Sequence, residues 1–286
     1  MPAGRFAPSP SGVLHVGNLR TAVLAWLFAR STGRRFVLRV EDLDRVRAGA
    51  EEQQLDDLRA LDLDWDGPVV RQSEHVERFD AAVAALDAAG LTYPCFCTRR
   101  EVQEAPSAPH LPPGAYPGTC RDLTADERAR RRAERPAAVR LRASVTSWTV
   151  HDVLHGDVEG AVDDLVLRRN DGVAAYNLAV VVDDTAQDVD QVVRADDLLT
   201  SAPRQAYLAS LLGHPQPTYA HVPLAVNTQG VRLAKRDGAV TLADLGRDRA
   251  WAMIVDSLGL EGDSPADLLA DFDPVRLPRQ PWTVVG

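Results

Sequence analysis

Three cysteines lie in one stretch of this 286-residue chain, and their spacing suits a metal ion. Cys95 and Cys97 are separated by one residue, and Cys120 follows within the same Pro-rich segment. Zinc takes four tetrahedral ligands of nitrogen, sulfur or oxygen type. No fourth cysteine exists, so the remaining ligand would be His110 or Tyr116, and general ligand preference favours His110. A segment with little apolar core would gain stability from a metal; the alternative is three free cysteines.

A second set of residues suits a small dicarboxylic ligand. Arg5 and Arg194 fall at the ends of expected strands, and a guanidinium binds a carboxylate through two parallel hydrogen bonds. Glu41 offers a carboxylate to an ammonium group. An amino acid with two carboxylates and one ammonium would use this combination, and Tyr176 would add a hydroxyl or a pocket wall. Each residue taken alone is also compatible with an ordinary surface position.

The N-terminal stretch Gly4–Arg30 suits an anionic ligand. A short apolar segment leads into a Pro/Ser/Gly-rich loop, which is followed by an apolar run at helical spacing. Such a strand, loop and helix direct backbone N–H groups and the helix dipole towards an anion. Asn18 is expected to be the helix N-cap, and Gly12 and Gly17 would allow a ligand to approach closely. An ordinary strand–loop–helix turn is the alternative.

An α/β framework is expected to position these residues. Residues 1–44 predict a β–α–β unit whose second strand, 35–40, ends in Glu41 and Asp42, and ligands of open α/β sheets bind beyond the carboxyl ends of strands. Further helices are expected at 48–61, 74–89, 126–134, 195–213, 242–258 and 265–272, and strands at 138–143, 148–153, 161–167, 174–182 and 189–194. Residues 93–136, broken by Pro and Gly, predict an irregular insert. The basic run at 130–132 is expected to be a solvated helix face, with RNA contact as the alternative.

Bulk composition sets further limits. The net charge of −9 and the pI near 5.3 argue against indiscriminate nucleic-acid binding, although a local basic patch for one RNA is compatible with them. No apolar run is long enough to span a membrane and no secretory pattern is present, so we expect a cytoplasmic protein, which we also expect to be a monomer.

Three strings carry a resemblance to a known family. RFAPSPSGVLHVGN, residues 5–18, resembles the class I aminoacyl-tRNA synthetase signature in its glutamyl form, with His15–Asn18 in place of the HIGH motif and Asn18 in place of its last His. RVEDLD, residues 39–44, is similar to the same family. RLAKR, residues 232–236, stands where class I synthetases carry KMSKS, in a degenerate form. The resemblance implies a Rossmann-like synthetase core.

The resemblance also implies roles for particular residues. The glutamate site would comprise Arg5, Phe6, Ala7, Pro8, Ser9, Glu41, Tyr176 and Arg194. The ATP site would comprise His15, Gly17, Asn18 and Lys235, with Lys235 and His15 as the catalytic pair, and Lys235 would stabilise the leaving pyrophosphate. The zinc ligands would be Cys95, Cys97, Tyr116 and Cys120, because the fourth ligand in that family is a Tyr four residues before the last Cys.

The length points to one branch of the family. A glutamyl-tRNA synthetase has a large anticodon-reading portion, and this chain stops about fifty residues after Lys235, so it resembles the glutamyl-Q tRNA(Asp) synthetase family. The expected organisation is a core at 1–92 and 173–240, an insert at 93–172 and a helical subdomain at 241–286. The implied reaction activates L-glutamate with ATP and Mg²⁺, without tRNA, and esterifies queuosine in the anticodon loop of tRNA(Asp).

Two alternatives remain at this level. One is ordinary charging of the tRNA 3′ end. The other is a non-catalytic, zinc-stabilised RNA-binding paralogue, which Asn18 and the degenerate RLAKR string would fit.

Overall fold

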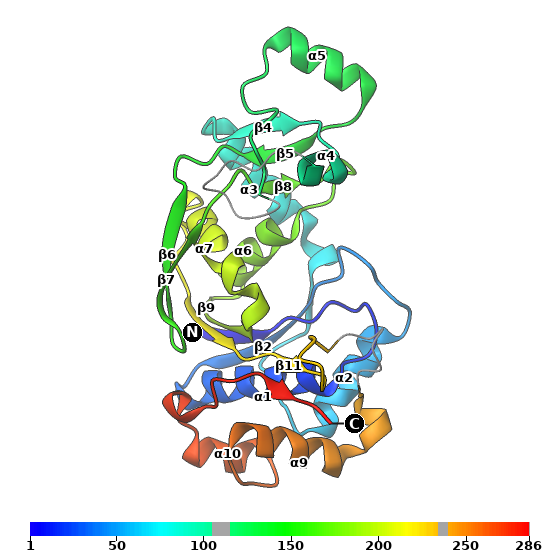
Figure 1. The fold of residues 1–286 in the computed structure, drawn as a ribbon, viewed down its shortest axis with the longest axis vertical. Helices are drawn as coiled ribbons and strands as arrows, with labels where there is room; N and C mark the ends of the chain where they lie inside the picture. The colour runs from blue at the N-terminus through cyan, green and yellow to red at the C-terminus, as the bar shows by residue number, and fades with distance from the viewer. Residues whose placement is uncertain (105–114, 234–239, 286) are drawn as a thin grey trace.

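A seven-stranded sheet forms the centre of the computed structural model, which describes residues 1–104, 115–233 and 240–285 (Figure 1). Its strands are β1 (Ala3–Phe6), β2 (Arg35–Val40), β3 (Val70–Arg71), β6 (Ser147–Asp152), β7 (Gly156–Ala161), β9 (Val189–Ala195) and β10 (Thr218–Val222). They are ordered β3-β2-β1-β9-β10-β6-β7, and neighbours run parallel except for the antiparallel hairpin β6–β7. The predicted α/β fold is confirmed.

Helix α1 (Val16–Ser31) lies on one face of the sheet and is buried almost all round. Its apolar residues therefore occupy every side rather than one stripe. A Cβ on Gly4 of β1 would lie 2.9 Å from Ala29 Cβ, so the helix rests directly on the strand. Three helices pack around it: α2 (Ala50–Ala60), α9 (Arg247–Leu258) and α10 (Pro265–Asp271) (Figure 1).

The other face carries α6 (Tyr176–Ala186) and α7 (Ala202–Leu211). The short 3₁₀ helix η2 (Asp196–Ser201) comes directly before α7. The sequence predicts a core strand over 174–182, and this prediction is wrong. Three consecutive valines, 180–182, give the run strand propensity, but they are buried in a helix that packs against β9, α7 and α3 (Val76–Ala88). Tertiary packing therefore overrides local preference.

A small antiparallel sheet stands at one end of the molecule (Figure 1). It comprises β4 (Thr92–Cys95), β5 (Ala138–Leu141) and β8 (Val166–Arg168), with α4 (Arg99–Glu104) beside it and the exposed α5 (Ala125–Glu134) beyond it (Figure 1). The strand predicted at 161–167 is wrong, because residues 162–165 connect β7 to β8. The hairpin β6–β7 lies within the expected insert at 93–172, yet it belongs to the large sheet.

The C-terminal portion returns to the start of α1. Strand β11 (Ala225–Val226) pairs in parallel with β12 (Trp282–Thr283), and α8 (Leu242–Leu245) follows the segment that contacts His15. The remaining short elements are η1 (Gln72–His75) and η4 (Pro274–Arg276). None of the helices in the described ranges is long and apolar enough to cross a membrane.

Candidate functional site

Four polar side chains project from one face of the large sheet. Successive residues of a strand alternate between faces, and the parallel register places Arg39, Arg5, Arg194 and His221 on the same face of β2, β1, β9 and β10. The neighbouring Gly4 faces α1 on the other side. The four side chains therefore face the helices α6 and α7, beneath which they are buried.

Asp184 of α6 holds two of these cations together. Its Oδ1 lies 3.2 Å from Arg5 Nε and 2.8 Å from Arg39 Nη2, and Arg39 also lies 3.4 Å from Glu41 Oε1. Burial alone would raise the pKa of Asp184, but Arg5 and Arg39 outweigh it and hold that pKa below its ordinary value. The carboxylate is therefore ionised and fixes both guanidinium groups.

Glu41 lies at the carboxyl end of β2 and lines a cavity of about 170 Å³ with Ser9, Gln72 and Tyr176 among its other walls. Burial raises the pKa of Glu41, and the attraction of Arg39 and Arg5 only partly opposes this. A buried carboxylate with incomplete compensation is suited to receive an ammonium group.

Arg194 of β9 is almost completely buried, and each of its nitrogens has a partner. Nε donates to His221 Nε2 at 3.0 Å, Nη1 to Gln205 Oε1 at 2.8 Å, and Nη2 to the Leu198 carbonyl at 3.3 Å. A guanidinium has five N–H groups, so one remains on each terminal nitrogen. Two terminal N–H groups suit bidentate binding of a carboxylate.

Tyr176 lies where these charges meet. Burial and the Glu41 carboxylate raise the pKa of Tyr176, while Arg194 and Arg5 act in the opposite direction. All three charged groups are thus within electrostatic reach of its phenol, and the structure brings together the four residues expected to bind a dicarboxylic amino acid. Its side chain is 44% exposed because it also faces the open cleft described below.

The residues at the end of β1 and in the loop after it lie at different distances from the small cavity. Ser9 lines the small cavity, and the Pro8 carbonyl accepts a hydrogen bond from Glu41 N at 3.0 Å. Ala7 is half-buried, whereas the Phe6 side chain belongs to the core on the α1 side, so only its backbone is near the site. Gln54 of α2, which the sequence did not indicate, holds the loop by donating to the Ser9 and Gly12 carbonyls.

Helix α1 begins with a different N-cap residue from the one that the sequence suggests. The N-cap is His15 rather than Asn18: His15 Nδ1 accepts from Asn18 N, and Asn18 Oδ1 accepts from His15 N, both at 3.2 Å. The reason is that helical geometry begins at Val16, which puts Asn18 at the third helical position of a capping box. Val16 N donates to the Val240 carbonyl, so the amides of residues 16 and 18 are already engaged.

Gly17 is required by packing. A Cβ there would lie 2.6 Å from Ala225 Cβ and 3.1 Å from the His15 ring. Lys235 lies outside the described residues, as does His110. The described flanks of the Lys235 segment are both anchored near α1, because Leu233 N donates to the Ala225 carbonyl and Thr241 bridges to His15.

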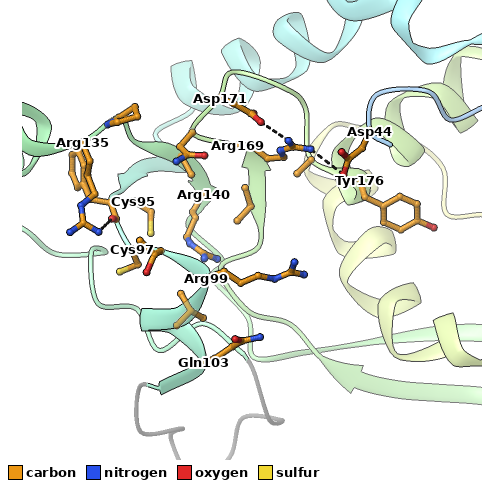
Figure 2. Close-up of a pocket in the computed structure, with 18 residues that line it drawn as sticks. Asp44, Cys95, Cys97, Arg99, Gln103, Arg135, Arg140, Arg169, Asp171 and Tyr176 are labelled. Carbon is orange, nitrogen blue, oxygen red and sulfur yellow. Dashed lines mark hydrogen bonds and ion pairs between the residues drawn. The ribbon is translucent and has the colours of Figure 1, made fainter. Parts of the chain in front are cut away.

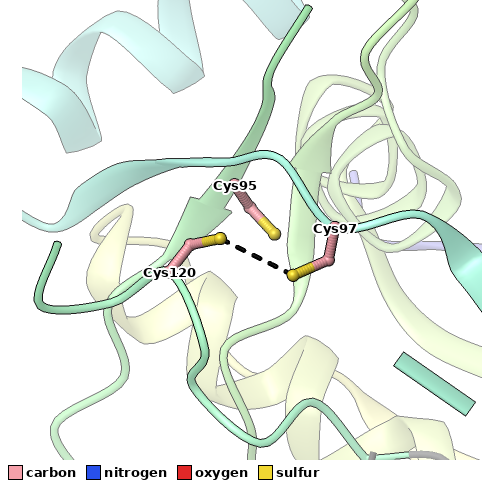
Figure 3. A group of neighbouring side chains, drawn as sticks. All are labelled: Cys95, Cys97 and Cys120. Atoms are coloured by element: carbon pink, nitrogen blue, oxygen red, sulfur yellow. Dashed lines mark hydrogen bonds between the residues drawn. The ribbon is translucent and has the colours of Figure 1, made fainter. Parts of the chain in front are cut away.

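The three cysteines converge beside β4 (Figure 3). Their Sγ atoms lie within 4.8 Å of one another, and Tyr116 Oη is 3.3 Å from Cys95 Sγ and 3.7 Å from Cys97 Sγ. Cys120 Sγ accepts a hydrogen bond from Phe96 N at 3.5 Å. This bond and the hydrogen bonds from Tyr116 and the other cysteines outweigh burial and hold the pKa of Cys120 below its ordinary value. Burial and the neighbouring Cys95 instead raise the pKa of Cys97 to about 12. Four donor atoms at such separations fit a tetrahedral ion with bonds of about 2.3 Å.

An open cleft of about 860 Å³ runs from the cysteines to Tyr176 (Figure 2). It shares Asp44, Arg169 and Tyr176 with the small cavity as lining residues, so the two are adjacent. Its lining is basic, with Arg99, Arg135, Arg140 and Arg169 against Asp44 and Asp171. The cleft is larger than the small cavity, and its lining carries more arginines than carboxylates.

Several residues of the site were not foreseen. They are Arg39, Asp152, Asp184, Gln205 and His221. The sequence could have indicated Arg39, because it interrupts an apolar strand, and Asp184, because it follows an apolar run. The roles of the other three residues arise only from contacts between segments that are distant in the sequence.

Comparison with known proteins agrees with the fold. Residues 3–268 match the family model described as tRNA synthetases class I (E and Q), catalytic domain. A crystal structure of a glutamate tRNA ligase from Elizabethkingia meningosepticum, in complex with its amino acid, superposes with a TM-score of 0.82 at 25% identity, over 99% of this chain and 66% of that one. The fold and the site define a class I tRNA synthetase catalytic domain, a ligase.

Curated relatives narrow the class. A protein of Nocardia farcinica is 67% identical over 98% of this chain and 92% of its own length, and one of Symbiobacterium thermophilum is 44% identical over 98% and 95%. Both are named Glutamyl-Q tRNA(Asp) synthetase, as is a protein of Cutibacterium acnes that is 58% identical over 85% of this chain and 70% of its own length. The chain belongs to the glutamyl-Q tRNA(Asp) synthetase family.

Proposed function

We propose that this enzyme activates L-glutamate with ATP and Mg²⁺ in the absence of tRNA and transfers the glutamyl group to queuosine in the anticodon loop of tRNA(Asp). The observation that carries the proposal is that Arg5, Arg194 and Glu41 all lie within electrostatic reach of the Tyr176 phenol, and that Glu41 and Tyr176 line one small cavity. The cavity volume of about 170 Å³ suits an amino acid better than a nucleotide. The names of the curated relatives support the acceptor.

The cavity favours glutamate by its charges. Three buried arginines, Arg5, Arg39 and Arg194, are accompanied by the carboxylates of Glu41, Asp183 and Asp184. Asp184 is occupied by Arg5 and Arg39, whereas no carboxylate of the described residues pairs with Arg194, whose partners are His221, Gln205 and the Leu198 carbonyl. One N–H on each terminal nitrogen of Arg194, with Arg5 beside it, would bind carboxylates, and Glu41 would bind the ammonium.

In the first step, the α-carboxylate of glutamate attacks the α-phosphorus of ATP in line, and pyrophosphate leaves. His15 and the first turn of α1, with Asn18 as its capping partner, would adjoin the nucleotide. Lys235 would stabilise the charge that develops on the pyrophosphate. In the second step, a hydroxyl of the queuosine base attacks the acyl carbon of the mixed anhydride, so that an ester bond forms, the acyl–phosphate bond breaks and AMP leaves; the protein contributes positioning and charge stabilisation.

The basic cleft supports an RNA acceptor. It adjoins the small cavity at Tyr176, which lines both, and its arginines suit phosphate groups (Figure 2). Cys95 and Cys97 line the cleft, and we propose that these two residues, Cys120 and Tyr116 hold one structural zinc beside it. When bound, the ion would stabilise the small sheet beside the cleft by linking its segments. Tyr116 would be the fourth ligand, because its Oη lies within 3.7 Å of two of the sulfur atoms.

The test uses radiolabelled glutamate, ATP and tRNA(Asp) that either carries or lacks queuosine. After nuclease cleavage, label is expected in the anticodon-loop fragment of the queuosine-containing tRNA alone. Label at the 3′ end of both tRNAs would show ordinary charging instead. No label and no adenylate would indicate a non-catalytic protein.

A further inference from the structure

A fully buried pair of side chains stands behind Arg194, on the side away from the amino-acid cavity. Asp152 ends β6 and His221 lies on β10, and neither side chain is exposed. His221 Nδ1 is 2.6 Å from Asp152 Oδ2, and His221 Nε2 accepts from Arg194 Nε at 3.0 Å. The result is a line of three groups across three adjacent strands, β6, β10 and β9.

The chemistry of Arg194 fixes the tautomer of His221. A guanidinium only donates hydrogen bonds, so the imidazole nitrogen facing it must be unprotonated. The single proton of the neutral ring is therefore on Nδ1, where it is donated to Asp152. Burial lowers the pKa of His221; Asp152 opposes this effect and Arg194 adds to it, so the ring stays neutral.

Asp152 is equally constrained. Oδ1 accepts from the amides of Leu154 and His155 at 2.8 and 3.0 Å, and Oδ2 accepts from His221 N and its ring. Burial would raise the pKa of Asp152, but these hydrogen bonds lower it overall. An ionised carboxylate with four donors has no rotational freedom, and it therefore holds the imidazole in one orientation.

We propose that Asp152 and His221 are positioning residues that orient the Arg194 guanidinium so that its two terminal N–H groups face the amino-acid substrate. Gln205 and the Leu198 carbonyl hold the terminal nitrogens from one side, and His221 fixes the rotation by engaging Nε. Tyr219, stacked on His221 at 5.7 Å, limits movement of the ring. The inference rests on the proposed role of Arg194 in glutamate binding.

Two substitutions separate the hydrogen bond from the packing. His221→Phe keeps a ring against Tyr219 but removes the acceptor for Arg194, whereas His221→Gln keeps an acceptor at the position of Nε2. In glutamate-dependent ATP–pyrophosphate exchange, H221F is expected to raise the KM for glutamate by about tenfold, the loss of one hydrogen bond to a charged group. The KM for ATP should be unchanged, and H221Q should remain within about threefold of the wild type.

Arg194→Lys is the reference variant, and it should raise the KM for glutamate more than H221F does. If R194K raises that KM and H221F does not, or if H221F changes the KM for ATP equally, the positioning role is wrong. If R194K leaves the KM for glutamate unchanged, the premise and the inference both fall. A wild-type protein without any exchange would refute the proposed function itself.

The tautomer of His221 can also be measured in the wild-type protein, so this test does not require that the variants fold. Long-range ¹H–¹⁵N NMR at neutral pH, with H221Q used to assign the signal, should show His221 as the neutral Nδ1–H tautomer. A protonated ring or the Nε2–H tautomer would overturn the inference.

Discussion

Arg39 and Asp184 form an ion pair beneath the amino-acid cavity, with Nη2 and Oδ1 2.8 Å apart and the Arg39 side chain closed to solvent. The same Asp184 oxygen accepts from Arg5, and the same Arg39 nitrogen reaches Glu41. Two residues that do not line the cavity thus determine where two proposed ligand-binding groups lie. The site is built on a buried charge network, and its stability and its function are coupled.

Arg39→Met is expected to destabilise the fold strongly. Removing Arg39 leaves Glu41 without its ion pair and Asp184 with Arg5 alone, and breaking a buried ion pair in this way costs about 3–5 kcal/mol. Urea unfolding measures the loss. Arg100→Met is the matched control, because Arg100 pairs with Glu104 at the exposed surface and should lose no more than about 1 kcal/mol. Equal losses in the two variants would contradict a stabilising role for the network.

Glu41→Gln should separate binding from stability. Loss of the carboxylate removes the partner of the substrate ammonium, and the KM for glutamate should rise about 30-fold, equivalent to about 2 kcal/mol. Because burial raises the pKa of Glu41 in the folded state, its ionisation opposes folding once the pH exceeds the unfolded-state pKa. E41Q should therefore be more stable than the wild type at pH 7.

This stability difference should vanish below about pH 4, where Glu41 is protonated in both states. Glu74→Gln, at an exposed pair with Arg71, is the control and should change neither quantity. An E41Q protein that is less stable at pH 7 would contradict the direction of the pKa shift.

Purified protein should carry about one zinc ion per chain, and Tyr116→Phe should weaken its retention about tenfold or more against a chelator. Tyr116 Oη lies within 3.7 Å of two cysteine sulfurs, which is why its loss should matter. His110→Ala is the comparison, since His110 is the other ligand that the sequence allows. Greater zinc loss from H110A than from Y116F would identify the histidine as the ligand.

Arg99→Ala should weaken tRNA binding without affecting glutamate activation. Arg99 lines the basic cleft but not the small cavity. Removing one phosphate contact should lower the slope of log K against log salt by about 0.7–1. Arg59→Ala, an exposed arginine of α2 that lines neither cavity, is the control. A change in pyrophosphate exchange for R99A would instead connect this residue to the first step.

Local pattern predicted much of the framework. Helix α1 and strands β1 and β2 were expected from apolar spacing, and so were the helices near the C-terminus. Strand propensity misled at Val180–Val182, because burial between the sheet and α3 stabilises a helix there. The pairing of β6 with β10, which adds the hairpin β6–β7 to the large sheet, was not predicted, because pairing between distant segments produces no local sequence pattern.

The candidate site shows the same division. Arg5, Glu41 and Arg194 could be proposed because charged residues at strand ends suggest a ligand and because the motifs resemble a known family. Asp152 and His221 could not, because their importance arises only when β6, β10 and β9 lie side by side. The N-cap was misassigned by three residues for a simpler reason: both His15 and Asn18 take part in one capping box.

The central claim is that one buried pocket selects glutamate and supports its activation without RNA. ATP–pyrophosphate exchange in the absence of tRNA, with glutamate, glutamine and aspartate compared at equal concentrations, tests it most directly. We predict exchange with glutamate that exceeds exchange with either analogue by at least about tenfold, as expected when a bidentate contact to a charged group is lost. No exchange with glutamate, or equal exchange with glutamine, would contradict the claim.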